Sequence, residues 1–203
     1  MKSKLIVFEG PDNIGKTTLC NELGKNLSSI GHRIEVISFP GNRSGTLGKF
    51  IHEFHHRYNK YGIENLSNTS LQLLHVAAHF DTITEDILPA LGKGKIVILD
   101  RFWWSTYVYG KVSGINNDVL EKIIELEELA WENLVPDQVF LLSNGRPFKE
   151  EVSPEWNGLR DEYLSLAEKQ ESKLKIKRIK NEGRIQKTVD EIIGILNFEF
   201  ITR

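Results

Sequence analysis

The sequence predicts an α/β fold in which a five-stranded parallel sheet is covered by helices on both faces. Short apolar runs of strand length alternate along the chain with longer stretches of helical periodicity, and this alternation is typical of parallel sheets. With 203 residues, 40% of them hydrophobic, the chain can bury one sizeable core, so we expect a single domain over residues 1–203. The strands are expected at residues 5–8, 34–39, 96–99, 139–142 and 175–179.

The first expected strand leads into residues 10–17, which read G-P-D-N-I-G-K-T and fit the phosphate-loop pattern G-x-x-x-x-G-K-T. Glycines let the backbone turn so that successive N–H groups point at an anion, and the following helix presents its positive end. Lys16 would carry positive charge to the outer phosphates, and the Thr17 hydroxyl is placed to hold Mg²⁺. The loop therefore predicts a bound nucleoside triphosphate, with contacts from Gly10, Asn13, Ile14, Gly15, Lys16, Thr17 and Thr18.

Polar residues also follow the second and third expected strands. Phe39-Pro40 precedes a turn that exposes Arg43, a guanidinium able to grip phosphate in bidentate fashion; the alternative is an ordinary solvated arginine. Asp100 follows the third strand and can organise a magnesium shell or orient Arg101, unless the pair is only a structural salt bridge. Ligands collect at this edge of open parallel sheets, so two arginines facing a triphosphate loop suggest a phosphorylated acceptor.

The remaining segments predict helices and a lid. Residues 70–91 have the pattern of a long helix, with Thr69 or Ser70 as its N-cap and Pro89 as a kink or an end. Residues 118–134 carry apolar residues at mixed three- and four-residue spacing and predict an amphipathic helix. Residues 143–158 hold prolines, glycines and asparagines among charged residues, and we interpret them as a lid over the ligand edge. The basic residues between 173 and 180 predict an exposed sheet edge.

The composition excludes several classes of partner. A formal net charge of −2 gives the molecule no electrostatic reason to coat nucleic acid or an anionic membrane. The longest apolar runs are strand-sized and too short to span a bilayer. The lone Cys20 cannot form an internal disulfide, which suits a reducing compartment. We therefore expect a cytoplasmic protein that acts on a small molecule, without a nucleic-acid polymer or a membrane as partner.

Five blocks spread over nearly the whole chain carry a family resemblance. They are Phe8-Glu9-Gly10 with Asp12 in the loop, Phe39-Pro40 with Arg43, residues 96–102 with Ser105, Pro136-Asp137, and Arg160 ahead of residues 163–167. In combination they resemble the thymidylate kinase family of P-loop nucleoside monophosphate kinases. The resemblance implies a three-layer P-loop kinase fold with a short lid, a homodimer, and Mg²⁺-dependent transfer of the γ-phosphoryl group of ATP to a deoxynucleoside monophosphate, with dTMP as the expected acceptor.

The resemblance also implies roles for individual positions. The expected catalytic residues are Lys16, Asp100, Arg101 and Arg146, and the expected metal ligands are Thr17 and Asp100. The expected substrate-binding residues are Asp12, Phe39, Arg43, His75, His79, Arg101, Ser105 and Tyr109. Asp12 would meet the 3′-hydroxyl of the acceptor sugar, and the two arginines would hold its phosphate. Because Asn13 is uncharged where the loop can supply a basic residue, the lid should provide the cation, from Arg146 or Lys149.

The chain departs from the family in the base pocket, where the usual phenylalanine and arginine are His75 and His79. A histidine can stack on a base or donate to a carbonyl, but it does not match the rigid fork of arginine. Trp103-Trp104 is interpreted either as core packing or as a reshaped contact to the base or lid. The histidines at 52, 55 and 56 include an i, i+4 pair of the kind that can bind zinc, but no acidic or cysteine residue completes such a site. Three alternatives stay open: another base specificity, a deoxynucleoside kinase, and a nucleotide-binding regulator without activity.

Overall fold

The computed structural model describes residues 3–144, 146–148, 151–182 and 184–197. Its centre is a sheet of five parallel strands in the order β2-β3-β1-β4-β5. The strands are β1 (Lys4–Glu9), β2 (Ile34–Ser38), β3 (Ile96–Asp100), β4 (Gln138–Leu142) and β5 (Ile176–Ile179). All five lie where the sequence predicts them, with ends that differ by one residue at most.

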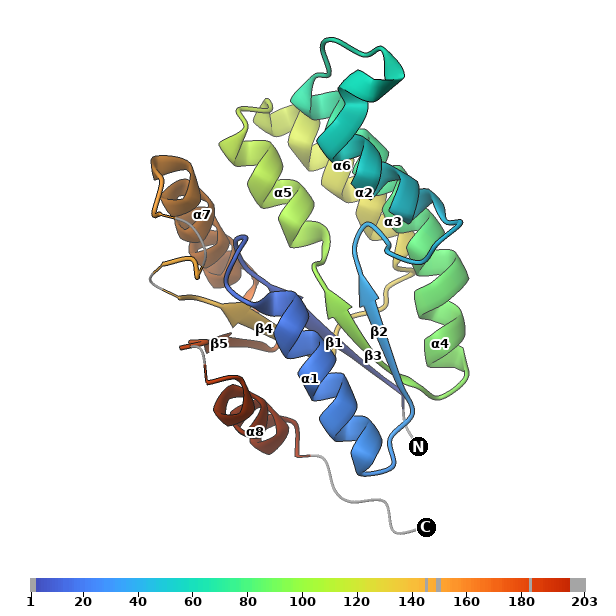
Figure 1. The fold of residues 1–203 in the computed structure, drawn as a ribbon, viewed down its shortest axis with the longest axis vertical. Helices are drawn as coiled ribbons and strands as arrows, with labels where there is room; N and C mark the ends of the chain where they lie inside the picture. Colours follow the sequence, from blue (N-terminus) through green and yellow to red (C-terminus); the bar gives the residue numbers. More distant parts are fainter. Residues whose placement is uncertain (1–2, 145, 149–150, 183, 198–203) are drawn as a thin grey trace.

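Helices connect the strands and leave the sheet edges exposed only at β2 and β5 (Figure 1). The α-helices are α1 (Lys16–Ser29), α2 (Leu47–Arg57), α3 (Asn68–Thr82), α4 (Leu88–Gly92), α5 (Trp103–Val112), α6 (Asn117–Ala130), α7 (Pro154–Gln170) and α8 (Ile185–Leu196). A 3₁₀ turn, η1 (Tyr58–Tyr61), follows α2, and a π turn, η2 (Ile83–Ile87), joins α3 to α4. No helix in the described part of the chain is long and apolar enough to cross a membrane.

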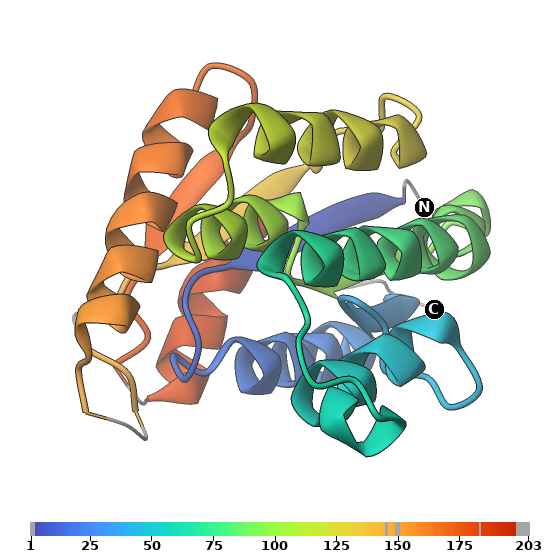
Figure 2. The ribbon, with the colours of Figure 1, turned by 90° about the horizontal axis from the view of Figure 1, so that it is seen from above.

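Alternate residues of each central strand enter two separate cores, one on each face of the sheet. Leu5 and Val7 of β1 pack with apolar residues of η2, α5, α6 and α7, whereas Ile6 and Phe8 pack with α1 and α8. Figure 2 shows the sheet between these two helical layers. The three-layer arrangement with helices on both faces is therefore confirmed.

The long helix expected at residues 70–91 is three consecutive helical pieces rather than one. The N-cap prediction was wrong, because Ser67 accepts from the backbone N–H of Ser70 and the helix begins at Asn68. The π turn η2 ends at Ile87, two residues before Pro89, which sits in the first turn of α4. Proline has no backbone N–H and therefore cannot donate the hydrogen bond of a regular α-helix. The π turn lies just before Pro89, the position where this bond is missing.

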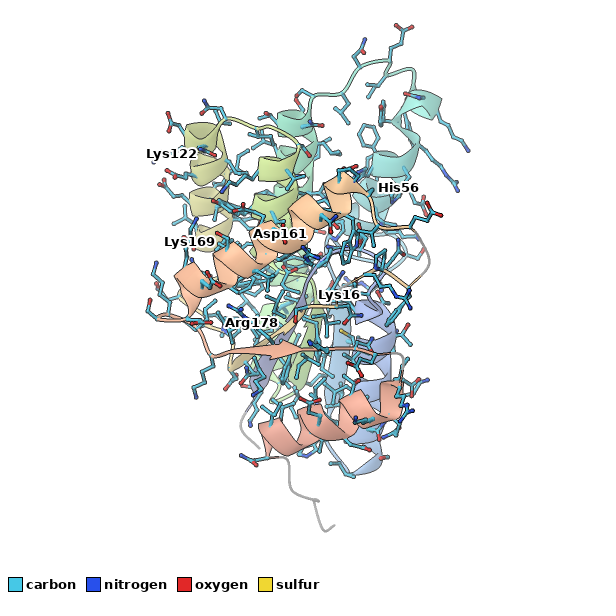
Figure 3. All side chains as sticks on the ribbon, turned by 90° about the vertical axis from the view of Figure 1, so that its left-hand side faces the viewer. Lys16, His56, Lys122, Asp161, Lys169 and Arg178 are labelled. Carbon is cyan, nitrogen blue, oxygen red and sulfur yellow. The ribbon has the colours of Figure 1, made fainter. Side chains whose placement is uncertain are left out.

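Two other boundaries also differ from the prediction. The helix expected at 118–134 is α6, which begins after an Asn116 cap and ends at Ala130. The expected lid is shorter at its far end, because residues 154–158 form the first turns of α7 after a Ser153 cap. The last strand is an edge strand as predicted. Its exposed Arg178 reaches Glu168 and Glu171 at 3.3 and 3.4 Å, and Figure 3 views the molecule from this side.

Strand order places the ligand edge at β1. The strands β2 and β3 lie on one side of β1, and β4 and β5, which follow in the chain, lie on the other; ligands of open parallel sheets bind where the order reverses in this way. The phosphate loop leaves the carboxyl end of β1, and Asp100 ends the neighbouring β3, opposite Phe8 in the register. The two motifs singled out in the sequence therefore meet at one edge of the sheet.

Candidate active site

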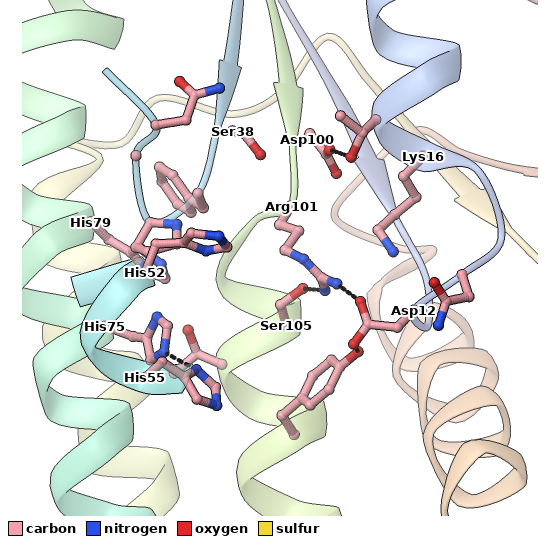
Figure 4. A pocket seen from close by; sticks show the side chains of 18 of the residues that line it. Asp12, Lys16, Ser38, His52, His55, His75, His79, Asp100, Arg101 and Ser105 are labelled. Carbon is pink, nitrogen blue, oxygen red and sulfur yellow. Dashed lines mark hydrogen bonds and ion pairs between the residues drawn. The ribbon is translucent and has the colours of Figure 1, made fainter. Parts of the chain in front are cut away.

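A cavity of about 720 Å³ opens beyond the carboxyl ends of β1, β2 and β3. The phosphate loop and the start of α1 form one end, α2 and α3 form the other, and α5 lies between them (Figure 4). The side chains that line it include Asp12, Lys16, Thr17, Thr18, Phe39, Gln72, Asp100, Arg101, Ser105, Thr106, Tyr109 and five histidines. Most of the residues predicted from the sequence are thus brought together in one cavity.

The phosphate loop has the backbone conformation of an anion receptor. Its φ angles are positive at Gly10 (137°), Asn13 (62°) and Gly15 (83°), so successive N–H groups can turn toward one side. No side chain caps the N-terminus of α1, which leaves the first N–H groups of the helix available to a ligand. Ile14 is fully buried and Gly10 lies against the carbonyl of Leu142, so both serve through the backbone.

Lys16 is a buried lysine that points along the loop, where Nζ donates to the carbonyl of Pro11 at 2.6 Å. Burial, and next the positive charge of Arg101, lower the pKa of Lys16 to about 8, while Asp100 and Asp12 oppose this effect. A phosphate anion beside Nζ would raise the pKa of Lys16, as the two carboxylates do. The site is therefore short of negative charge where the motif expects a triphosphate.

Asp100 and Thr17 form the part of the cavity suited to a metal ion. The Thr17 hydroxyl donates to Asp100 Oδ2 at 2.5 Å. Asp100 is buried, and its Oδ1 atom has no hydrogen-bond partner among the described residues. A carboxylate and a hydroxyl are hard oxygen ligands, the kind that Mg²⁺ takes together with phosphate oxygens. The residues present therefore fit a magnesium ion.

Arg101 links the third strand to the phosphate loop. It has a positive φ of 76°, its N–H donates to Phe8 O at 2.9 Å, and its guanidinium forms an ion pair with the Asp12 carboxylate. The same guanidinium donates to Ser105 Oγ at 2.9 Å. Tyr109 lies beside it, with the ring centroid 5.4 Å from the guanidinium carbon, and its hydroxyl donates to Asp12 at 2.6 Å. Three predicted substrate-binding residues, Asp12, Ser105 and Tyr109, thus surround one arginine.

These contacts set the charge of Asp12. Burial acts to raise the pKa of its carboxyl, but the charges of Arg101 and Lys16 outweigh burial and hold the pKa below its usual value. The Trp156 indole N–H also donates to the backbone carbonyl of Asp12 at 3.0 Å, so α7 supports the loop at this point. Asp12 is therefore an ionised acceptor facing the cavity.

Glu9 is a supporting residue that the sequence reasoning did not assign to the site. It is fully buried at the end of β1 and accepts from the N–H of Phe102 at 2.6 Å, from the N–H of Ser105 at 3.1 Å and from the Ser105 hydroxyl at 2.9 Å. Burial raises the pKa of Glu9, and the nearby Arg101 charge opposes this. The sequence feature that could have indicated this role is a charged residue at the end of an apolar strand. Glu9 holds the turn that carries Arg101.

Five imidazoles line the end of the cavity farthest from the loop. His55 Nδ1 and His75 Nε2 share a hydrogen bond of 2.9 Å between α2 and α3. His79 Nδ1 lies 2.8 Å from Glu127, and its ring stacks on Phe39 at a centroid distance of 4.0 Å. Burial is the main cause that lowers the pKa of His75, to about 3. His52 and His56 complete the wall from α2, but within the described residues no group of three or more histidine, cysteine or acidic side chains could hold a metal ion.

Two predicted cations do not reach the cavity. Arg43 forms an ion pair with Asp86 at 2.9 Å and lines a separate hollow beside β2, so its expected approach to the phosphate loop is not what the structure has. Arg146 is exposed and is not among the cavity-lining residues, and Lys149 lies outside the described residues. From the lid it is Phe148 that lines the cavity, with its N–H donating to Asn13 O at 2.7 Å.

Comparison with known proteins identifies the family. The thymidylate kinase family model matches residues 8–192 of the chain. The chain belongs to the thymidylate kinase family. It is 32% identical to the thymidylate kinase of Ligilactobacillus salivarius over 97% of this chain and 99% of that protein. It is 36% identical to the thymidylate kinase of Thermoanaerobacter sp. over 68% of this chain and 64% of that protein.

The fold also matches a solved thymidylate kinase structure, that of Ehrlichia chaffeensis. The TM-score is 0.79 at 24% sequence identity, with 97% of this chain and 100% of that chain covered. The P-loop fold predicted from the sequence is therefore confirmed. The tryptophan pair at 103–104, whose two interpretations were left open, packs in the core of this thymidylate kinase family member, with Trp104 fully buried.

Proposed function

We propose that the protein transfers the γ-phosphoryl group of ATP to dTMP, giving dTDP and ADP. The observation that carries this proposal is the contact between Asp12 of the phosphate loop and Arg101 at the end of β3. It puts a guanidinium suited to a second phosphate in the same cavity as Lys16 and the triphosphate loop. A hydrolase would need only water at that place. Membership of the thymidylate kinase family supports dTMP as the acceptor.

Phosphoryl transfer requires positioning and charge stabilisation more than covalent chemistry from the protein. The loop N–H groups and Lys16 would bind the donor phosphates, with Lys16 next to the transferred group. Arg101 would hold the acceptor phosphate so that one of its oxygens attacks the γ-phosphorus while the ADP oxygen leaves. Asp12 would accept from the 3′-hydroxyl of the acceptor sugar, and Tyr109 would keep Asp12 in place.

A magnesium ion would be held by Thr17 and Asp100 together with donor phosphate oxygens. When bound, it supplies positive charge to the β- and γ-phosphates. Arg146 is proposed as the lid cation and Arg43 as a second ligand of the acceptor phosphate. For each of them a side-chain movement from the position described here is required. Cytoplasmic location and a homodimer belong to the same proposal.

A coupled ADP-release assay tests the proposal with ATP, Mg²⁺ and a panel of ribo- and deoxynucleoside monophosphates. We expect acceptor-dependent ADP release with dTMP. Arg101→Ala should raise the KM for dTMP and lower kcat, because the acceptor phosphate loses its guanidinium. Arg178→Ala is the matched control, since Arg178 is exposed on β5 and should leave both constants unchanged. Absence of acceptor-dependent release with every nucleotide would refute the kinase assignment.

A further inference from the structure

Gln72 is a buried polar residue with an unused side-chain amide. It is 8% exposed, lines the cavity, and has no hydrogen bond to any described residue. It lies on α3 in register with His75 and His79, three and seven residues later, so the three side chains share one face of the helix. An amide that faces a cavity without a protein partner is available to pair with a molecule bound there.

Three other polar side chains of α3 and α5 that line the cavity each hydrogen-bond to another side chain. His75 bonds His55 at 2.9 Å, His79 bonds Glu127 at 2.8 Å, and the Thr106 hydroxyl donates to Glu127 at 2.9 Å. Glu127 is fully buried, and its two hydrogen bonds link α3 to α5. On the face of α3 that it shares with His75 and His79, Gln72 is consequently the side chain that makes no hydrogen bond to a described residue.

The position of Gln72 indicates which part of a nucleotide it would meet. The donor-only cations Lys16 and Arg101 lie at the loop end, beside Asp12, whereas the histidines of α2 and α3 lie at the other end (Figure 4). An acceptor nucleotide with its phosphate at Arg101 would extend its base toward the histidines of α2 and α3. The Gln72 amide would then face the polar edge of that base.

We propose that Gln72 reads the base of the acceptor, and that the site accepts cytosine as well as thymine deoxynucleoside monophosphates. This inference rests on the proposed function. A primary amide offers one donor face and one acceptor face, and no described neighbour holds Gln72 in either orientation. One orientation pairs with the N3–H and O4 of thymine, and the flipped one with the N3 and amino group of cytosine. His79 Nδ1 donates to the acceptor-only Glu127 carboxylate, whereas in the bond between His55 and His75 either nitrogen can be the donor.

The wild-type enzyme gives the first test. We expect kcat/KM for dCMP within about 100-fold of that for dTMP, because a site with a fixed donor or acceptor pattern discriminates by about 10⁴-fold or more, whereas the Gln72 amide can turn either its donor or its acceptor toward the base. A larger preference for dTMP would overturn the dual specificity. If neither nucleotide is phosphorylated, the proposed function fails instead, so the two failures are distinguishable.

Variants at position 72 test the residue itself. Gln72→Leu should raise the KM for dTMP and for dCMP by about 5–30-fold with a smaller change in kcat, since about 1–2 kcal/mol of pairing is lost. Gln72→Glu offers only an acceptor, so it loses the donor that would pair with O4 of thymine or N3 of cytosine and should raise both KM values. Gln186→Leu on the exposed face of α8 is the matched control and should change neither KM.

Folding is checked separately. Thermal unfolding of each variant is measured, and Gln72→Asn, which keeps the amide but shortens it by one methylene, replaces Gln72→Leu if the latter does not fold. It should raise both KM values by the same mechanism. Unchanged KM values for both nucleotides in a folded Gln72→Leu or Gln72→Asn enzyme that retains turnover would refute the role of Gln72.

Discussion

Lys16 shows how the surroundings of one residue set its chemistry. The P-loop sequence requires a lysine here, but burial and the adjacent Arg101 lower its pKa to about 8, close to working pH. Arg101 follows the last residue of β3 and lies 85 positions after Lys16 in the chain, so this effect depends on the fold. At the same scale, burial lowers the pKa of His75 to about 3 and keeps its imidazole neutral.

The pKa of Lys16 predicts a pH dependence of ATP binding. Bound triphosphate stabilises the charged lysine, so the complex keeps a proton that the free protein loses above about pH 8. Affinity should therefore fall as pH rises above 8, by up to about tenfold per unit. Calorimetric Kd values at pH 7, 8 and 9 measure this. The Lys16→Arg protein, which cannot deprotonate, should show a flat profile, and a flat wild-type profile would contradict the prediction.

His75 predicts a pH dependence of stability. Its folded pKa is about 3 and its ordinary value is 6.5, so between these values the unfolded chain binds more protons and stability falls as pH falls. His75→Phe removes the contribution of this histidine to the pH dependence of the unfolding free energy. We expect the loss of unfolding free energy between pH 7.5 and 5 to shrink by about 1–2 kcal/mol in the variant. Urea denaturation at both pH values provides the measurement, and equal losses in both proteins would be evidence against it.

At the scale of elements, α2 is positioned by close backbone contact with the turn after β2. A Cβ on Gly48 would lie 2.6 Å from the Gly41 Cα and closer still to Pro40 O, so only glycine lets α2 approach this turn. Thr46 caps the helix by accepting from the Lys49 N–H. The approach matters to the site because α2 carries three of the cavity histidines.

Gly48→Ala should push α2 away from the turn after β2. We expect a loss of about 1–3 kcal/mol of stability and a raised KM for the acceptor, because the histidine wall moves with the helix. Gly194→Ala is the control: Gly194 lies in α8 with no atom within 4 Å of its would-be Cβ, and alanine there should stabilise by about 0.5–1 kcal/mol. Chemical denaturation and steady-state kinetics test both variants, and an unchanged Gly48→Ala protein would contradict the packing argument.

The ion pair between Arg43 and Asp86 competes with the role proposed for Arg43. If Arg43 leaves Asp86 to bind the acceptor phosphate, Asp86→Asn should lower the KM for dTMP. The expected effect is at most about fivefold, because exposed pairs contribute about 0–1 kcal/mol. Arg43→Ala should raise the same constant. Initial-rate kinetics measure the KM for dTMP in both variants. A KM that is unaffected by Arg43→Ala would exclude Arg43 from phosphate binding.

At the scale of the whole molecule, one helix exposes an apolar surface that bears on assembly. α6 exposes Val119, Leu126 and Leu129, the last by 72%, and their spacing places them on one side of the helix. An exposed apolar stripe of this kind favours contact with another chain, and the proposed homodimer would cover it.

Leu129→Asp should therefore convert a dimer into a monomer. Light scattering after gel filtration should give twice the 23.3 kDa chain mass for the wild type and the single mass for the variant. The variant should keep its thermal stability at low concentration, because Leu129 contributes little to the core of its own chain. A wild-type protein that is monomeric at all concentrations would refute the dimer.

Much of the fold followed from local patterns. The five strands were predictable because buried parallel strands are short apolar runs between helical stretches, and the phosphate loop was recognisable because its backbone geometry demands fixed glycines. Asp100 and Arg101 could be placed at the same edge by the rule for open sheets. Three local features could not be predicted: the helix cap at Ser67, the π turn before Pro89 and the end of α6. At each of them several neighbouring residues were equally suitable, and tertiary packing determined which one was used.

The sequence by itself determined that this chain carries a triphosphate loop on a parallel α/β sheet and belongs among P-loop kinases. Those features reside in contiguous residues whose spacing is dictated by backbone geometry. Only the tertiary structure decided that Arg43 pairs with Asp86 and that the histidines of α2 and α3 form one wall with Gln72. Such contacts join residues distant in the chain, and their distances and burial depend on how α2, α3 and α5 pack around the cavity.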